Sequence, residues 1–302
     1  EMARRMTLPD TVHSLDAIRP DHLLYRALGM SLIMWDSVQP TEAWIDEQVP
    51  ATVSRALFPS RYGTSGLASE ENKRGHMKSR DARQLQPRDA LNLYMCTITG
   101  YCYGMGLVFA GTSDDRAKNA ILSKLKFLQS IRDNRPQLEL SIILDRTIKP
   151  LVDMCISVVA VSLSVVMAGS GDIDCLRTLR ELRWRVDDVT FGTHMALSMS
   201  IGMLFLAGGN ASVKRDPLSI ACLLLCICPR FPSRTVDNQF HLQAFRHMYV
   251  VAVENRVLKT VDVDSGEPVP VTVDMEMRDG RNVTMRAPCL LPELDSIAAV
   301  RV

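Results

Sequence analysis

The sequence predicts a mainly α-helical fold, an α-solenoid of helix–turn–helix repeats, followed by a small antiparallel β meander. Two observations predict the solenoid. Apolar residues recur at helical spacing through most of the chain, and three apolar helices end alike, with Ala, then Gly, then a polar turn. A third observation predicts the meander, because apolar and polar residues alternate strictly in a segment after residue 255. The length of 302 residues and the hydrophobic fraction of 47% exclude a disordered chain.

Charge and cysteine content narrow the function classes. The chain has 35 Lys and Arg residues against 34 Asp and Glu residues, so its net charge is +1. A generic binder of nucleic acid or anionic membrane needs a basic excess, so this balance argues against both kinds of partner. The eight cysteines lie mostly inside apolar runs, and we expect them to be buried thiols of a protein in a reducing compartment.

The chain begins with a helical repeat segment over residues 1–59, followed by a flexible loop over 60–88. In the first segment Leu23, Leu24 and Ala27 belong to an apolar stripe at helical spacing. The second segment holds few large apolar residues and many charges, so it cannot bury enough surface to become ordered.

Residues 89–255 are predicted to form the repeat α-solenoid, built from paired helices. Three stretches, 155–168, 195–207 and 218–228, are apolar nearly all round. Each has roughly 11–14 residues, against about 20 needed to cross a bilayer, so we expect buried helices and no membrane partner. The predicted helices cover 90–111, 114–132, 138–168 with a break near Pro150, 173–184, 193–207, 217–228 and 242–252.

The helix ends carry the repeat signature. The small side chain of the Ala in each turn is expected to let a neighbouring helix cross closely. The Gly permits the left-handed conformation that ends the helix. Ala168 and Ala207 are roughly 40 residues apart, a period typical of helical solenoids, whereas the unit before Ala168 needs an insertion. The signature residues are Gly106, Ala110, Gly111, Ala168, Gly169, Gly171, Gly202, Ala207, Gly208 and Gly209.

The last segment, 256–302, is predicted to be rich in β-structure. Residues 269–277 alternate between apolar and polar, and Asp279-Gly280 is a strong hairpin turn. An upstream run, 257–263, precedes a second turn. We therefore expect a three-stranded antiparallel meander over about 256–287, with its apolar face packed on the last helices or on a partner.

A catalytic site is hard to find in this sequence. It lacks the nucleophile elbow, phosphate loop, zinc-protease and dinucleotide motifs. Cys222, Cys226 and Cys228 have no partner pair at a metal-binding spacing, so they are interpreted as core residues, and His194 as a structural histidine. We expect no metal, cofactor or small-molecule ligand, and a scaffold rather than an enzyme. The alternative from another class is an enzyme with an unrecognised site near His194 and Cys222.

Several local sequences resemble one known family. They include 157–172, 194–209 and, most specifically, 219–250, and they run in order over about 90–300. The chain is similar there to the family of the largest subunit of the anaphase-promoting complex, or cyclosome. It departs from that pattern after Gly209, where Asn follows instead of a further Gly. The matching residues in the stretch 219–250 are Pro229, Phe231, Pro232, Asp237, Asn238, His241, Leu242, Gln243, Arg246, His247 and Tyr249.

The resemblance implies a fold, a function and partners. The fold is a toroid of proteasome/cyclosome repeats, and the chain is expected to be a C-terminal portion of a longer protein. The function is a non-catalytic scaffold of a ubiquitin ligase that controls the metaphase-to-anaphase transition, located in nucleus and cytoplasm. The implied partners are a cullin-like and RING module, tetratricopeptide-repeat subunits and activator proteins. The alternative with the same repeats is a non-ATPase scaffold subunit of the proteasome regulatory particle.

Overall fold

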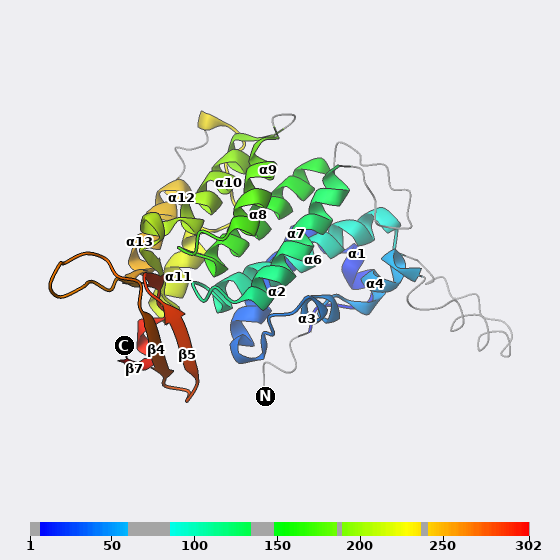
Figure 1. The fold of residues 1–302 in the computed structure, drawn as a ribbon. Coiled ribbons are helices and arrows are strands. Elements are labelled where there is room, and N and C mark those ends of the chain that lie inside the picture. The colour runs from blue at the N-terminus through cyan, green and yellow to red at the C-terminus, as the bar shows by residue number, and fades with distance from the viewer. Residues whose placement is uncertain (1–6, 60–84, 134–147, 186–188, 237–240, 302) are drawn as a thin grey trace, which may run out of the picture. The chain divides into compact units, whose positions relative to one another are not determined.

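A computed structural model describes residues 7–59, 85–133, 148–185, 189–236 and 241–301 (Figure 1). The fold is mainly helical, with short antiparallel sheets toward the C-terminus, as the sequence predicts. The predicted loop over 60–88 lies almost wholly outside the described residues. The chain divides into two compact units. Unit 1 is Glu1–Met105 with Asn119–Val159, and unit 2 is Gly106–Lys118 with Ala160–Val302.

Unit 1 is built from helices. Its elements, some of which continue into unit 2, are α1 (Val12–Asp16), α2 (Pro20–Ile33), α3 (Glu42–Glu47), α4 (Ala51–Leu57), α6 (Pro87–Val108), α7 (Asp115–Arg132) and α8 (Lys149–Val166). The predicted stripe is confirmed at Leu23, Leu24 and Ala27, which are buried on α2, but not at Ile33, where the pattern ends and the side chain is 53% exposed. Pro20 stands in the first turn of that helix, where a missing N–H costs nothing.

Two glycines let α6 approach α2 closely. A Cβ added to Gly100 would overlap the carbonyl of Leu24, and one added to Gly104 would overlap the Ser31 side chain. The two glycines are four residues apart, so they lie on one face of α6. The Ser31 hydroxyl donates to the Ala27 carbonyl at 3.0 Å and therefore needs no partner from α6.

A buried cation joins α7 to α3. The Lys124 side chain is nearly inaccessible, and its Nζ donates to Glu42 Oε1 at 3.0 Å and to Asp46 Oδ1 at 2.7 Å. The Tyr94 hydroxyl donates to the same Asp46 oxygen at 3.2 Å. Lys124 is thus fully paired, which is what a buried charge requires.

Unit 2 combines helices with short strands. Its further elements are α9 (Ile173–Arg183), α10 (Phe191–Leu204), α11 (Pro217–Cys226), α12 (His241–Ala244), α13 (Tyr249–Ala252), β1 (Ala211–Val213), β2 (Val253–Asn255), β3 (Val257–Leu258), β4 (Thr272–Met277), β5 (Asn282–Arg286), β6 (Cys289–Leu290) and β7 (Ile297–Arg301). The predicted start of α11 is confirmed, because the Asp216 carboxylate accepts from Leu218 N and Ser219 N, and Pro217 stands in the first turn.

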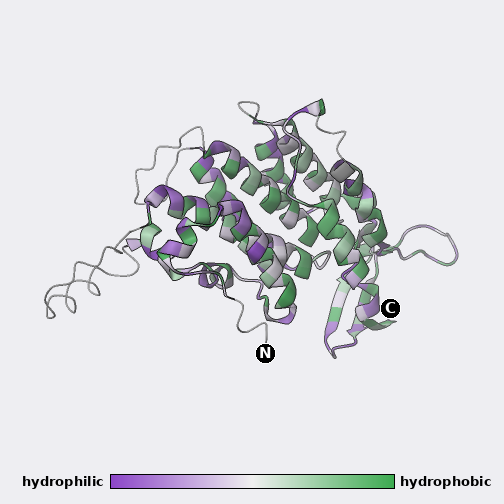
Figure 2. Ribbon diagram, turned by 180° about the vertical axis from the view of Figure 1, so that it is seen from behind, coloured by the Kyte–Doolittle hydropathy of each residue, from purple (hydrophilic) through white to green (hydrophobic). Residues whose placement is uncertain are grey.

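The predicted β4–β5 hairpin is confirmed, but the predicted meander is wrong in its third strand. The hairpin turns at Gly280, and Figure 2 shows its tip as hydrophilic. Val273, Met275 and Met277 face the interior in strict alternation. The third strand of the sheet is β7, not the run 257–263. Only the start of that run is a strand, and it pairs with β6. Val261 and Val263, later in the run, are exposed and belong to no sheet.

One predicted helix differs from the structure, and another lies partly outside the described residues. Of the two helices predicted on either side of Pro150, the structure describes the second, which begins at Lys149 with Pro150 in its first turn. The helix predicted over 242–252 is divided into α12, a 3₁₀ turn (Phe245–Met248) and α13. Helix α8 has 18 residues, so it begins before the apolar stretch 155–168.

By length and composition alone, two helical stretches of the described chain could cross a membrane, Lys149–Val166 and Phe191–Gly209. Most of the first stretch is buried inside the protein, as in the core helix of a soluble domain.

A pair of glycine substitutions tests the close contact in unit 1. Gly104→Ala is expected to lower the free energy of unfolding by about 1–3 kcal/mol, because its Cβ overlaps Ser31. Gly29→Ala on α2 is the matched control, since nothing lies within 4 Å of its added Cβ. That change is expected to stabilise by about 0.5–1 kcal/mol through helix propensity. Urea denaturation of the two variants measures both values, and equal effects would contradict the close packing.

Candidate functional site

The candidate site is the set of Ala-Gly turns in unit 2, because the sequence signature points to it. Gly111, Gly169 and Gly208 have φ values of 63°, 79° and 65°. These values lie in the left-handed region that glycine adopts without steric cost, as predicted from the sequence.

The first two turns are connected by backbone hydrogen bonds that repeat the same pattern. In each, the Gly N–H donates to a carbonyl near the end of the next apolar helix, and the residue two positions later donates to the following carbonyl. The pairs are Gly111 N to Val165 O at 2.8 Å, Ser113 N to Val166 O at 3.0 Å, Gly169 N to Met203 O at 3.0 Å, and Gly171 N to Leu204 O at 3.0 Å. We call these four bonds the turn ladder. They satisfy carbonyls at helix C-termini that have no partner within the helix.

Strand β1 passes directly against the ladder. A Cβ on Gly111 would overlap the Val213 carbonyl, and a Cβ on Gly169 would overlap the Ala211 carbonyl. These glycines are therefore required twice, for their backbone conformation and for the close approach of β1. The wholly buried Ser212 between those two carbonyls donates its single hydroxyl hydrogen to Ala168 O at 2.8 Å.

A buried arginine completes this region. Arg256 is 1% exposed, and its guanidinium donates from Nη1 to Gly111 O at 2.9 Å and from Nη2 to Val213 O at 2.6 Å. Its Nε donates to Glu254 Oε2 at 2.7 Å, which balances the charge. Its backbone N–H donates to Asn210 O at 3.0 Å. We call these contacts the Arg256 junction.

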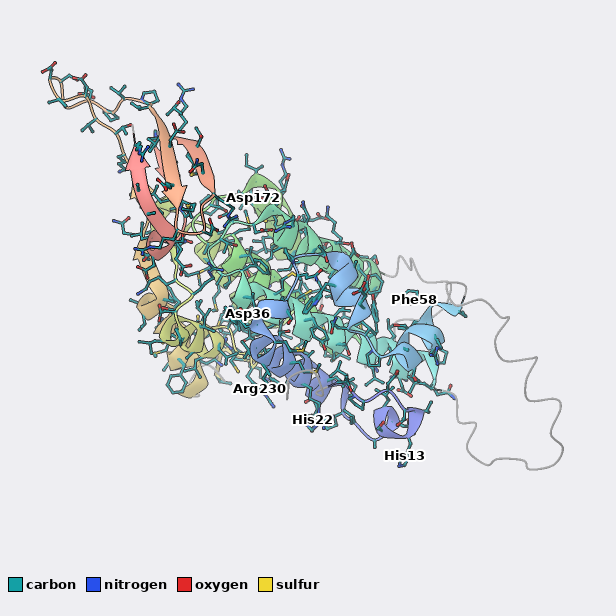
Figure 3. The ribbon with its side chains drawn as sticks, turned by 90° about the horizontal axis from the view of Figure 1, so that it is seen from below. His13, His22, Asp36, Phe58, Asp172 and Arg230 are labelled. Carbon is teal, nitrogen blue, oxygen red and sulfur yellow. The ribbon has the colours of Figure 1, made fainter. Side chains whose placement is uncertain are left out.

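Asp172 occupies the start of α9 (Figure 3). Its Oδ1 accepts from Cys175 N at 2.9 Å, the bond expected of an N-cap, and its Oδ2 accepts from Lys118 Nζ at 3.1 Å. Burial alone would raise the pKa of Asp172, but these two hydrogen bonds favour the charged carboxylate and lower the pKa overall. The pKa of Lys118 is raised, chiefly by its contact with Asp115.

A second buried arginine, Arg246, joins the end of α11 to the residues that follow it. The Arg246 guanidinium donates to the carbonyls of Cys226 and Cys228 at 2.8 and 2.9 Å and to that of Arg230 at 3.0 Å. It lies over the Phe231 ring at 4.2 Å from the centroid, a cation–π contact. A cation at the C-terminal end of α11 also interacts favourably with the helix dipole.

The other matching residues of the segment 229–249 support the same structure or lie outside the described part. Gln243 accepts from Arg246 Nε at 3.0 Å. A Cβ on Gly192 would overlap the Pro232 carbonyl, so the segment packs closely on the start of α10. Pro229 is buried, Tyr249 half-buried and His247 exposed. Asp237 and Asn238, together with the side chains of His241 and Leu242, lie outside the described residues.

A further ion pair ties the C-terminal strands to α11. Arg215 donates from Nη2 to Glu293 Oε2 at 2.8 Å, and its backbone N–H donates to Glu293 Oε1 at 3.0 Å. Burial alone would raise the pKa of Glu293, but Arg215 outweighs it and lowers that pKa. Arg215, Ser212 and Arg256 had no assigned role at the sequence level. Arg256 lies in a stretch, 254–256, that resembles the family, but nothing in the sequence of these three residues indicates which distant groups they contact.

The signature alanines do not all act as predicted. Ala110 and Ala168 are buried, as expected where helices cross. Ala207 is exposed, with φ of 49°, so the expectation that it keeps a helix crossing slim is wrong. The reason is that α10 ends at Leu204, before Ala207, and both Ala207 and Gly208 have left-handed rather than helical backbone angles.

Of the remaining signature glycines, some have a structural reason and one has none. A Cβ on Gly106 would stand 2.8 Å from Ser162 Cβ, so this glycine does allow a close helix contact. Gly202 has nothing within 4 Å of such a Cβ, and the structure gives no steric reason for it. Gly209, at φ of 83°, needs its backbone conformation.

Among the described residues, those considered for catalysis or metal binding do not form a metal-binding cluster. In the part of the chain that the structure describes, no three His, Cys, Asp or Glu side chains could hold one metal ion. All eight cysteines belong to that part and are free thiols, six of them buried. Burial raises the pKa of Cys226 to about 11 and that of Cys102 to about 12, so both stay protonated at neutral pH. Cys222 is buried and His194 half-buried.

Comparison with known proteins gives one consistent result. A family model described as the APC1 fifth domain matches residues 1–254. The chain is 35% identical over 318 residues to anaphase-promoting complex subunit 1 of Dictyostelium discoideum, covering 100% of the chain and 14% of the relative. It is 37% identical over 303 residues to the Emericella nidulans protein named negative regulator of mitosis, covering 100% and 13%. It is 33% identical over 300 residues to human anaphase-promoting complex subunit 1, covering 97% and 14%. The chain thus spans about one seventh of these relatives.

The Arg256 junction can be tested by substitution. Arg256→Met leaves Glu254 and two carbonyls without their buried partner, so we expect a loss of about 3–5 kcal/mol in the free energy of unfolding. Arg256→Lys keeps the charge but not the fork of donors, so an intermediate loss is expected. The control is Arg281→Met, which removes an exposed pair with Asp279 and is expected to leave the free energy of unfolding nearly unchanged. Equal losses in Arg256→Met and the control would contradict the junction.

The two alanines give a second test. Ala168→Leu is expected to lower the free energy of unfolding by about 1–3 kcal/mol, because a larger side chain overpacks a fully buried position. Ala207→Leu makes the same change at an exposed turn and is expected to cost little. Thermal and urea unfolding of both variants measure the difference. If the two changes prove equally costly, Ala168 does not lie at a tight crossing.

Proposed function

Since the chain belongs to the family of the APC1 fifth domain, we propose that it is a non-catalytic scaffold segment of an anaphase-promoting complex subunit. The relatives that carry the name anaphase-promoting complex subunit 1 align with the whole chain or nearly all of it. Such a segment joins catalytic and substrate-recognition modules of a ubiquitin ligase and so contributes to the control of mitosis.

The turn ladder is the observation that supports this role best. Its two halves repeat the same bonds between successive turns and helix ends, so one helical unit is stacked on the next by the same backbone geometry. A stack that grows by repeating one interface is the construction of an α-solenoid. We propose that unit 2 is a stretch of such a solenoid, and that the whole protein closes it into a toroid of proteasome/cyclosome repeats.

The proposed partners are the other subunits of the complex. We expect a cullin-like and RING module, tetratricopeptide-repeat subunits and activator proteins, in nucleus and cytoplasm. The surface available to them is extensive, because solenoids present long concave faces and edges. In this proposal ubiquitin transfer itself belongs to the cullin-like and RING module.

Two rival functions predict different results. A non-ATPase subunit of the proteasome regulatory particle would share the repeats, but the relatives reported above carry names from the anaphase-promoting complex or from mitosis. An enzyme with a site near His194 and Cys222 would need activated groups, whereas Cys222 is buried. Turnover by the purified protein that is lost in His194→Ala would support the enzyme and overturn the scaffold.

Co-purification tests the scaffold role. A tagged full-length subunit isolated from mitotic cells is expected to bring cullin-like and RING subunits with it. The same subunit carrying Arg256→Met is expected to bring less of them, because the junction that holds the turns is lost, whereas Arg281→Met should behave as wild type. Quantitative mass spectrometry measures the recovered subunits. Recovery of proteasome ATPases in their place would contradict the proposal.

A further inference from the structure

A hairpin arm, residues 259–270, projects from the C-terminal strands (Figure 1, Figure 3). It leaves the chain just after β3 and returns just before β4. Every residue from Val261 to Pro270 is exposed, and Val263 is 97% exposed. The arm therefore contributes almost nothing to the core of unit 2.

The arm is nevertheless held in one shape by its own backbone. Val269 N donates to Thr260 O at 3.0 Å, and Asp262 N donates to Glu267 O at 2.9 Å. Val261 forms an antiparallel bridge with Pro268 between these two bonds. Pro268 fixes its own φ and limits the freedom of the chain further. An arm ordered in this way loses little entropy when it binds a partner.

Two exposed apolar side chains lie at and near the tip. Val263 is almost fully accessible, and Val261 is 58% exposed. An isolated valine on a surface needs no explanation, but this pair stands on a projecting arm that the other strands of unit 2 leave exposed. Burying such a side chain in a partner is favourable because it removes apolar surface from water.

The charge of the arm defines the partner. Between residues 260 and 270 the sequence contains Asp262, Asp264 and Glu267 and no Lys, Arg or His, although the whole chain is nearly neutral. The Asp262 carboxylate accepts from Asp264 N and Ser265 N and so shapes the turn. Asp264 and Glu267 make no ion pair among the described residues, so their carboxylates are available to cations from outside.

We propose that this arm docks into a basic groove on a neighbouring protein chain of the complex. Val263 occupies an apolar socket there, and Asp264 and Glu267 pair with Lys or Arg side chains of the groove. The proposal rests on the scaffold role proposed above. The charge complementarity selects a basic protein surface, and it excludes an anionic membrane or a nucleic acid as the occupant.

Site-specific photo-crosslinking in the assembled complex tests this proposal. A photoreactive amino acid replaces Val263 in the tagged full-length subunit, and a matched subunit carries it at Thr284, an exposed position on β5. Irradiation of the purified complex is expected to join the Val263 position to one other subunit, at a peptide flanked by Lys or Arg. The Thr284 position is expected to give at least roughly tenfold less of that product.

Charge reversal is the second part of the experiment. Asp264→Lys with Glu267→Lys, in the subunit that carries the photoreactive group at 263, is expected to reduce the crosslink roughly tenfold, since like charges now meet the groove. Lys259→Glu is the control at the base of the arm and should leave the crosslink intact. The proposal is overturned if the Val263 position joins no other subunit, joins a second copy of this chain, or gives a product that charge reversal leaves unchanged. If the tagged subunit recovers no complex at all, the scaffold role itself fails.

Discussion

The buried guanidinium of Arg256 is the contact on which the arrangement of unit 2 depends. It donates to Gly111 and Val213, which lie 145 and 43 residues away along the chain. A buried charge is costly unless every donor has a partner, so the turn at Gly111, strand β1 and strand β2 must meet in one geometry. Apolar packing alone would tolerate small displacements of these segments, whereas the fixed fork of an arginine does not.

The turn ladder follows from the same constraint. Gly111 offers its N–H to Val165 and its carbonyl to Arg256, so the first turn is held from both sides. Neither contact is possible with a side chain on this residue, because β1 occupies the space of the Cβ. The glycine of each of the first two turns is thus required for the close approach of the backbone of β1.

The sequence predicted the helices of both units and the β4–β5 hairpin, because periodicity reports which face of an element is buried. It predicted the conformation of Gly111 and Gly169 for a similar reason, since only glycine meets the steric demand of the turn. It missed the Arg256 junction, because the guanidinium donates to backbone carbonyls that are remote in sequence. It also misassigned Ala207 and the strand 257–263. The apolar residues there fit a sequence pattern, but Ala207, Val261 and Val263 are exposed in the structure.

The junction also positions the arm that projects from the strands. The backbone carbonyl of Arg256 accepts from Leu291 N at 2.8 Å, next to the pairing of β3 with β6, and the arm begins at the end of β3. Arg215 and Glu293 fix the segment that follows β6 in the same way. The arm therefore emerges from strands that are anchored to buried charges rather than from a mobile tail. Because a ligand surface gains affinity when it is already ordered, this anchoring lets a small acidic hairpin act as a specific contact.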